Sequence, residues 1–335
     1  MTGQRVSVVL ALDTWETGIE AIEALRRQTI AGHIEVVLVG PGIVVPPGAA
    51  HGFAAVLTVE CPIHPLSVAR ARGIRAAREA VVYMAETHGF PQPDCLERLA
   101  DALGGEVVAA MPQIVNANPE TSRSWASLFA TYGAFTGDRA RSASYVALHN
   151  GAFRATFLQR MAARPEDLVY GVGLTQTIQR EHLQAVYVPD AVVPHLNVER
   201  LAGVVMDRVV GGRLWAGIRS RGWSGPRRAV HAALFPIGAA VMTWRVLRSD
   251  GWRRHRGSTP WGVSALVAIW AGLQSCGEVA GYVTGPGDSE RRHLPLELHR
   301  RAYMRRPIGR GSLQGSQQRE KASTRVRLRQ GRSTQ

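Results

Sequence analysis

The first 200 residues predict an α/β fold with a mostly parallel sheet, because short apolar runs alternate with helical patterns. The runs at residues 6–12 and 34–39 are rich in Val, Ile and Leu, as are strands that are buried on both faces. Between them, Ile19, Ile22 and Leu25 recur at helical spacing. Alternating strands and helices favour a parallel sheet whose chemistry lies at the carboxyl ends of its strands.

A break rich in glycine and proline at residues 40–42 follows the second apolar run, where a nucleotide-binding loop would lie. A third unit then begins with a strand at 54–59 and continues with an Arg-rich helix at 66–79. It ends in a strand at 81–84, which extends the predicted sheet.

The residues after this last strand point most directly to a function. Glu86 and His88 place a carboxylate and an imidazole two residues apart at the strand end, and two prolines then lead into a helical pattern at 95–99. Many α/β enzymes present a metal and phosphate site in this way. A solvated Glu and His at a strand end would give the same pattern, so the residues alone leave both interpretations open.

The order of these segments resembles that of family 2 glycosyltransferases, which have a GT-A fold. The matching pieces are VSVVLALDTWE, EALRRQT, EVVLVGPG, ARARGIRAAREAVVYMAETHGFPQPDCLERL, ALHNGAFRATFL and VYVPDAVVPH. Together they cover the first 200 residues in the order that the family shows, which is more specific than any one piece. The resemblance implies a GT-A-like domain over residues 1–200 that takes a nucleotide sugar, with a UDP-sugar as the expected donor.

In that family, an Asp-x-Asp motif after the fourth strand holds Mn²⁺ or Mg²⁺ against the diphosphate of the donor. Here the same place reads Ala85-Glu86-Thr87-His88. His195 stands where similar enzymes place a histidine near the metal or diphosphate, although a histidine after a strand is also a common structural residue. We expect Glu86, His88 and His195 to bind the cation, more weakly than paired aspartates would.

The resemblance also assigns positions around the donor. The loop after the second strand usually supplies an Asp, and Gly40 in its place leaves only backbone contacts there. Asn150 and Arg154 belong to a segment that lines the diphosphate region, although an Arg after an apolar turn also fits a solvated helix residue. The full set of expected donor-binding residues is Leu12, Asp13, Glu16, Gly40, Arg72, Asn150 and Arg154.

The general base of an inverting transfer is less clearly marked. The family's Glu-Asp pair falls near Tyr170-Gly171 when counted back from VYVPDA, whereas Glu166 and Asp167 lie four residues earlier. A small register shift would make Asp167, or Glu166, the base that takes the proton of the acceptor hydroxyl. The same acids also fit a helix N-terminus, where they favour the helix dipole.

Charge divides the chain into two halves. Residues 1–200 carry 16 Arg against 19 Asp and Glu, a net charge of −3, whereas residues 201–335 carry 24 Lys and Arg against 7 acids, a net charge of +17. Six of the eight Trp also lie in the second half. Arg and Trp around apolar segments are typical of a membrane interface. We therefore expect a helical, membrane-associated region over 201–304, with an anionic membrane surface as its partner.

Two uncharged segments, 229–244 and 261–277, are shorter than the ~20 residues of a usual membrane span. The second reaches that length only if it continues through Glu278 to Val283. Arg residues flank both segments on every side, so a single span would place a basic flank on the wrong side of the membrane. We expect the segments to lie in the cytoplasmic leaflet, and a soluble helical subdomain is the alternative.

The basic tail over 305–335 is rich in Arg, Gln, Ser and Gly, which predicts disorder. Its attraction would be to phosphate, in RNA or in anionic lipid alike, so we expect no specific nucleic-acid partner. Three scattered cysteines exclude a disulfide framework and fit a reducing cytoplasm. The apolar start at 6–12 has strand character, so we expect no signal peptide.

These observations predict a glycosyltransferase at the cytoplasmic face of the plasma membrane. It would transfer a sugar from a nucleotide-sugar donor to a lipid-linked or cell-surface glycan, in an inverting reaction assisted by Mn²⁺ or Mg²⁺. Two alternatives stay open. One is a catalytically degenerate GT-A domain that binds or scaffolds in glycan assembly, and the other is a peripheral binder of anionic surfaces whose basic half is the functional part.

Overall fold

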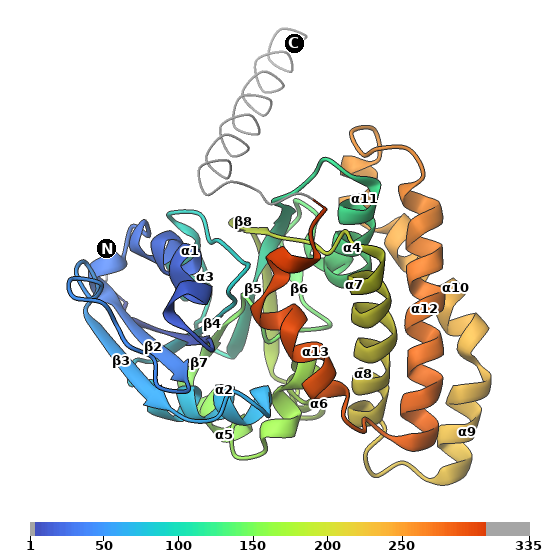
Figure 1. Cartoon of the computed structure of the whole chain (residues 1–335), viewed down its shortest axis with the longest axis horizontal. Coiled ribbons are helices and arrows are strands. Elements are labelled where there is room, and N and C mark those ends of the chain that lie inside the picture. The colour runs from blue at the N-terminus through green and yellow to red at the C-terminus, as the bar shows by residue number, and fades with distance from the viewer. Residues whose placement is uncertain (1–3, 306–335) are drawn as a thin grey trace, which may run out of the picture.

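In the computed structural model, which describes residues 4–305, a mixed sheet flanked by helices stands beside a layer of long helices from the last third of the chain (Figure 1). The predicted fold class is thereby confirmed: the sheet is mostly parallel, and a helical region with an apolar helix follows it. Apart from Arg305, the tail predicted to be disordered lies outside the described residues.

The sheet has eight strands in the order β3-β2-β1-β4-β7-β5-β8-β6. β7 runs antiparallel to β4 and β5, and β6 runs antiparallel to β8, while all other pairs are parallel. The carboxyl ends of β1, β4 and β8 therefore lie at one edge. The strands are β1 (Val6–Ala11), β2 (Ile34–Gly40), β3 (Ala55–Glu60), β4 (Val81–Ala85), β5 (Val107–Asn116), β6 (Arg141–Ser142), β7 (Ala152–Arg154) and β8 (Gln184–His195).

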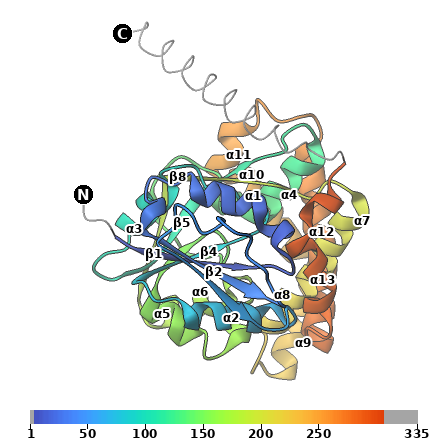
Figure 2. The same ribbon diagram turned by 60° about the vertical axis from the view of Figure 1, so that its left-hand side comes forward.

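The helices in the first 200 residues cover both faces of this sheet (Figure 2). The apolar runs predicted as strands form β1 to β4 within a residue or two of the expected bounds, whereas the helix predicted over 66–79 ends three residues earlier, because Ala77 turns to an extended conformation. These helices are α1 (Trp15–Arg26), α2 (Leu66–Ala76), α3 (Cys95–Asp101), α4 (Ser122–Tyr132), α5 (Ala155–Met161) and α6 (Val172–Arg180).

The last third of the described chain forms the helical layer and then returns to the sheet. A π-helical turn (Met206–Val210) joins the first two helices of this region. The helices are α7 (Leu201–Val205), α8 (Gly211–Arg219), α9 (Gly225–Ala233), α10 (Phe235–Arg248), α11 (Asp250–His255), α12 (Val263–Thr284) and α13 (Ser289–Leu298).

The two apolar segments predicted from the sequence correspond to α9 with α10 and to α12. By length and composition α12 is long and apolar enough to cross a membrane, and α9 with α10, bent by 61°, would count as one more span. α12 nevertheless packs against α4, α8 and α10, and the indole of Trp270 donates to the Ser127 hydroxyl at 3.3 Å. A third of the most apolar 18-residue stretch of α12 is buried inside the protein. The helix is therefore only weak evidence for a membrane span.

α9 and α10 expose apolar side chains on the outside of the helical layer. α9 has no buried residue, and α10 buries only Val246. Exposed apolar side chains on these two helices are those of Val230, Leu234, Phe235, Ile237, Val241 and Trp244. An exposed apolar face of this kind marks a surface that another molecule or a membrane covers.

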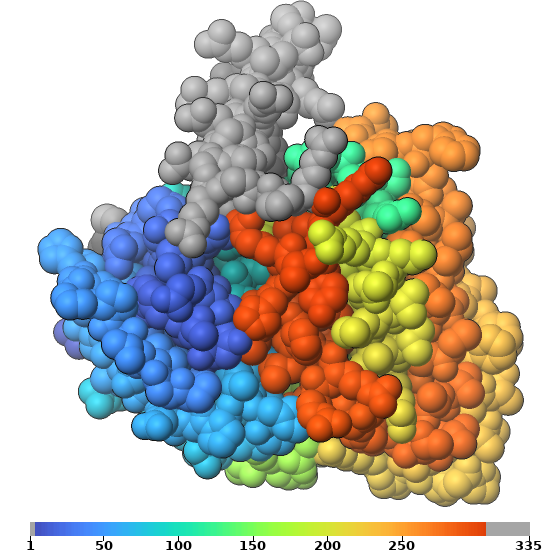
Figure 3. Space-filling view, viewed as in Figure 1, coloured from blue at the N-terminus to red at the C-terminus, as the bar shows by residue number. Residues whose placement is uncertain are grey.

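α13 and the 3₁₀ helix after it (Arg300–Tyr303) lie against the carboxyl edge of the sheet, between the N-terminal elements and α7–α8 (Figure 3). The carboxylate of Glu297 pairs with Arg70 of α2 at 2.9 Å. His299 pairs with Asp13, at the start of α1, at 2.8 Å. These contacts bring the C-terminal segment, residues 289–303, onto the edge where the strands end.

The end of β2 also meets this edge. The amide of Leu12 donates to the carbonyl of Val39 at 3.0 Å, and a Cβ at Gly40 would lie 1.9 Å from the carbonyl oxygen of Leu12. Because the groups of Leu12 and Val39 that meet here belong to the backbone, the end of β2 cannot shift without breaking the hydrogen bonds of the sheet. Gly40 is therefore fixed by the close approach of two backbones.

We predict that Gly40→Ala lowers the free energy of unfolding by about 1–3 kcal/mol, because the added methyl group overpacks a fixed backbone contact. The measurement is the midpoint of urea unfolding. Gly32→Ala is the matched control, since nothing lies within 4 Å of a Cβ there. Equal midpoints for the two variants would contradict the prediction.

Candidate active site

Glu86 lies directly after β4, where three strands meet. The amide of Asn150 donates to the carbonyl of Met84 at 2.7 Å, which joins the residues before β7 to the end of β4. The amide of Leu196 donates to the carbonyl of His88 at 3.0 Å, which joins the loop after β4 to the end of β8. Side chains from these three segments therefore converge on the carboxylate of Glu86.

Three imidazoles surround this carboxylate, and all four side chains are buried. His88 Nε2 lies 3.7 Å from Glu86 Oε1, and His149 Nδ1 lies 3.5 Å from the same oxygen. His195 Nε2 lies 3.5 Å from Oε2, and the side-chain amide of Asn150 donates to Oε2 at 2.6 Å. The structure thus brings the three residues predicted as metal ligands together and adds His149 to them.

The protonation states of this cluster suit metal binding. Burial lowers the pKa of His88 well below 6.5, and Arg300 lowers it further. Burial and Arg70 also lower the pKa of His149. Burial alone would raise the pKa of Glu86, but the surrounding imidazoles, His88 foremost, bring it below its usual value. These shifts favour a charged Glu86 carboxylate and neutral imidazoles at His88 and His149, the forms that ligate metals.

The geometry fits a metal ion in two overlapping groups whose ligand atoms lie within 4.8 Å of one another. His195 Nε2 and both ring nitrogens of His149 have no hydrogen-bond partner among residues 4–305. Unpaired buried nitrogens are unfavourable, and a cation would satisfy them. One carboxylate with imidazoles favours Mn²⁺ over Mg²⁺, which prefers oxygen. The groups are Glu86, His88 and His195, and Glu86, His149 and Glu297.

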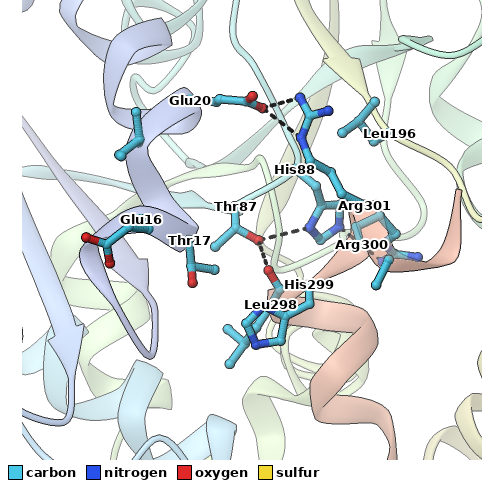
Figure 4. Close-up of a pocket in the computed structure, with 12 residues that line it drawn as sticks. Glu16, Thr17, Glu20, Thr87, His88, Leu196, Leu298, His299, Arg300 and Arg301 are labelled. Carbon is cyan, nitrogen blue, oxygen red and sulfur yellow. Dashed lines mark hydrogen bonds and ion pairs between the residues drawn. The ribbon is translucent and has the colours of Figure 1, made fainter. Parts of the chain in front are cut away.

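Two cavities adjoin the cluster. The outer one has a volume of about 450 Å³ and lies between α1, the loop after β4 and the C-terminal segment (Figure 4). Its polar lining residues are Glu16, Thr17, Glu20, Thr87, His88, His299, Arg300 and Arg301. The inner one measures about 60 Å³ and is lined by Glu86, His149, His195, Tyr132, Tyr170, Asp207, His293, Glu297 and Arg300, among others. Arg300 lines both.

A second buried chain of ionisable groups extends the inner cavity. His293 Nε2 lies 3.0 Å from Asp207 Oδ1, and His293 Nδ1 lies 3.4 Å from Glu297 Oε1. Burial lowers the pKa of His293, but the hydrogen bonds to the two carboxylates outweigh it and raise the pKa above 6.5. The two carboxylates therefore favour the protonated form of His293, and each of its ring nitrogens faces one of them.

The sequence analysis missed the residues that the C-terminal segment contributes. His293 and Glu297 are spaced by four residues on α13, so they share one side of that helix, and Arg300 follows in the 3₁₀ helix. This spacing could have been read from the sequence. It lies in the region that the sequence analysis assigned to the membrane, and nothing local links it to β4. His149 was also missed, although it stands next to Asn150 in a segment that was singled out.

Some of the predicted donor-binding residues lie at the outer cavity and others do not. Glu16 lines it, and Asp13 pairs with His299, which also lines it. Burial would raise the pKa of Asp13, but the hydrogen bond from Thr17 and the neighbouring His299 lower it. Asn150 contacts Glu86 instead of the cavity. The donor contacts of all these residues stay predictions.

Four other predicted positions lie outside both cavities. Leu12 is fully buried, and Gly40 packs against its carbonyl group. Arg72 is exposed on α2. Arg154 donates to the carbonyl of Gly105, at the opposite end of β7 from Asn150.

The two acids predicted as the general base face arginines. They lie in a 3₁₀ segment, Pro165–Gly171. Asp167 pairs with Arg164 at 3.1 Å, and Glu166 pairs with Arg221 at 3.6 Å. The structure places both carboxylates outside the two cavities, although Tyr170 of the same segment lines the inner one. Their catalytic role stays a prediction.

Comparisons with known proteins give structural similarities only, because no protein-family model and no curated protein matches the sequence. The chain is similar to the mannosyltransferase PcManGT from Pyrobaculum calidifontis in complex with GDP-Man and Mn²⁺ (TM-score 0.45, 16% identity, 88% of this chain and 87% of that one). It is also similar to S. aureus TarS 1-349 in complex with UDP (TM-score 0.39, 12% identity, 83% and 90%).

A further structure of S. aureus TarS matches with a TM-score of 0.41 and 10% identity over 83% of this chain, which spans 55% of the TarS chain in that structure. A mannosyltransferase is thus among the similar structures. Membership in family 2 is not tested by these matches. At TM-scores below 0.5 they do not decide the function, which has to be argued from the residues of the site.

We predict that the protein binds Mn²⁺ more tightly than Mg²⁺, and that His195→Ala weakens Mn²⁺ binding at least about tenfold. Loss of even an outer partner of a metal ligand commonly costs 10- to 100-fold in affinity, so loss of a direct ligand should cost no less. Calorimetric titration of the metal alone measures the effect. His51→Ala, at an exposed loop histidine, is the control, and equal affinity for both variants would exclude His195 as a ligand.

Proposed function

We propose that the protein is a glycosyltransferase that uses a nucleotide-sugar donor. The observation that supports this most is the cluster of Glu86 with His88, His149 and His195 at the carboxyl ends of β4 and β8, beside a cavity of about 450 Å³. Ligands of open α/β sheets bind at this edge. The donor would occupy the outer cavity, and the acceptor, a lipid-linked or cell-surface glycan, would approach from outside it.

A divalent cation, when bound, would neutralise charge that develops on the leaving diphosphate. Glu86, His88 and His195 would hold it, with His149 as a further nitrogen. Asn150 fixes the carboxylate of Glu86 by its 2.6 Å hydrogen bond, and the side chains of the cluster are buried from bulk solvent. The residues that this chain supplies therefore position the cation and the donor, and a separate carboxylate must take the proton of the acceptor hydroxyl.

We further propose that the protein attaches to the cytoplasmic face of the membrane through α9 and α10. The support is their exposed apolar face together with the arginines beside it. Arg227 lies over the ring of Trp223 and Arg248 over the ring of Trp244, a combination that suits the headgroup region of a bilayer. The helices would lie in the plane of the membrane.

A second candidate function is a degenerate GT-A domain that binds or scaffolds without catalysis. One observation favours it: the family's Glu-Asp position reads Tyr170-Gly171 here, and the backbone at this point takes positive φ angles of 52° and 70°. Neither residue of this turn carries a carboxylate. Transfer of a labelled sugar by the purified protein would exclude this alternative.

We predict that Mn²⁺ strengthens the binding of UDP or GDP, and that Glu86→Ala weakens nucleotide binding in the presence of Mn²⁺ by more than ~1 kcal/mol. The reason is that Glu86 is the carboxylate shared by both candidate metal groups. Calorimetric titration with and without Mn²⁺ measures the effect, with His51→Ala as the control. The assignment fails if Glu86→Ala and His51→Ala bind the nucleotide with the same affinity, both with and without Mn²⁺.

We predict that Asp167→Asn lowers turnover by ~10²-fold or more and leaves nucleotide binding intact, because it removes a base and no donor contact. Steady-state transfer of a labelled sugar is the measurement, and Glu166→Gln is the companion variant. Normal turnover of both variants would move the base to another carboxylate, of which Glu297 and Asp207 line the inner cavity.

We predict that the protein floats with vesicles that contain anionic lipid, and that Phe235→Glu with Ile237→Glu abolishes this association. The two side chains are exposed on α10, and their burial in the headgroup region would be lost. High salt should release the unmodified protein only partly, since apolar burial is not screened. Val44→Glu is the control, because Val44 is an exposed apolar residue far from α10 in the sequence. Unaltered flotation of the double variant would contradict the prediction.

A further inference from the structure

We propose that Arg300 binds the diphosphate of the donor, so that the C-terminal segment completes the donor site. This inference rests on the proposed function. It goes beyond it by naming a cationic residue that lies more than 100 residues outside the segments that resemble the glycosyltransferase family. The ligand class is a nucleoside diphosphate, recognised through its phosphates.

Arg300 is a buried cation that makes no direct ion pair with a carboxylate of residues 4–305. Its residue is 8% exposed, and no carboxylate lies within 4.0 Å of its guanidinium in that range. Asp207, which lines the inner cavity with Arg300, pairs with Arg208 and His293 instead. The Nε of Arg300 has no hydrogen-bond partner in the described part of the chain. A buried charge is strongly unfavourable unless it is paired and hydrogen-bonded, so the guanidinium has room for an anion in direct contact.

The hydrogen bond that Arg300 does make is a poor substitute for an anion. Its Nη2 donates to His88 Nε2 at 3.0 Å, and an imidazole nitrogen that accepts a hydrogen bond carries no negative charge to balance the guanidinium. A phosphate would offer two charged oxygens to the fork of a guanidinium, which is the geometry that arginine matches best. The guanidinium of Arg300 is thus placed to donate hydrogen bonds to an acidic ligand.

The neighbours of Arg300 are paired, and their pairs fix its position. His299 pairs with Asp13, just before α1, at 2.8 Å, and Arg301 pairs with Glu20 of α1. These contacts hold the segment across the outer cavity on both sides of Arg300, and Figure 4 shows the pair of Arg301 with Glu20. They also give a basic partner to two of the three carboxylates near the outer cavity. The third, Glu16, is exposed to solvent, where its repulsion is screened.

The position of Arg300 between the two cavities matches that of a diphosphate. A nucleotide sugar carries its diphosphate between the nucleoside and the sugar that is transferred. Arg300 lines both the outer cavity of about 450 Å³ and the inner cavity of about 60 Å³. A nucleoside in the outer cavity would therefore present its phosphates to Arg300 and direct the sugar toward Glu86.

The test is calorimetric titration of UDP, GDP and uridine, in EDTA, into the full chain and its variants. We expect Arg300→Gln to weaken UDP and GDP binding at least about tenfold and to leave uridine binding unchanged, because only the phosphates contact the guanidinium. Arg300→Lys should restore part of the affinity, since it keeps the charge and loses the fork. Arg292→Gln is the matched control, because Arg292 lies exposed on α13 and pairs with Asp288.

Equal UDP affinity in Arg300→Gln and the unmodified chain would overturn this inference and leave the proposed function standing. Absence of any nucleoside-diphosphate binding by the unmodified chain, with or without Mn²⁺, would overturn the proposed function and the inference with it. If Arg300→Gln does not fold, titration of the unmodified chain with UDP and with UMP tests the inference instead. A preference for UDP over UMP of at least about tenfold that fades with salt supports the inference, and equal affinities for the two nucleotides overturn it.

Discussion

The site depends on keeping the carboxylate of Glu86 charged in a buried position. An isolated buried carboxylate would be neutral or would destabilise the fold, so its surroundings have to compensate. Asn150 donates a hydrogen bond from a positive-φ conformation, and three imidazoles lie within 3.7 Å. The compensating residues come from three places: the loop after β4, the segment before β7 and the end of β8. The convergence of β4, β7 and β8 at one edge is therefore what allows the carboxylate to be buried at all.

The fold was largely predictable because its signals are local. The runs of β1, β2 and β4 are buried along their whole length, and such strands read as continuous apolar sequence. The segment predicted over 229–244 instead breaks at Leu234, two residues before Pro236. Proline lacks the amide that would continue the helix and restricts the residue before it, so this break could also have been read from the sequence.

The site was only half predictable, because half of it is assembled from distant residues. Glu86, His88 and His195 end strands, and a strand end can be read from its own neighbourhood. Arg300 lies 212 residues from His88, to which it donates, and no periodicity encodes that contact. The same hydrogen bond occupies the lone pair of His88 Nε2, so this nitrogen cannot accept from Arg300 and ligate a metal at once. A ligand that draws Arg300 away would free it.

The C-terminal segment has a consequence for the order of synthesis. Domains fold from the N-terminus as the chain emerges, so the sheet with Glu86 and its histidines can form while residues 289–303 are still inside the ribosome. Asp13, Glu20 and Arg70 would then face water until His299, Arg301 and Glu297 arrive. A chain truncated before α13 would keep the sheet and leave the site open. Translation of α13 is thus the step that covers the carboxyl edge of the sheet.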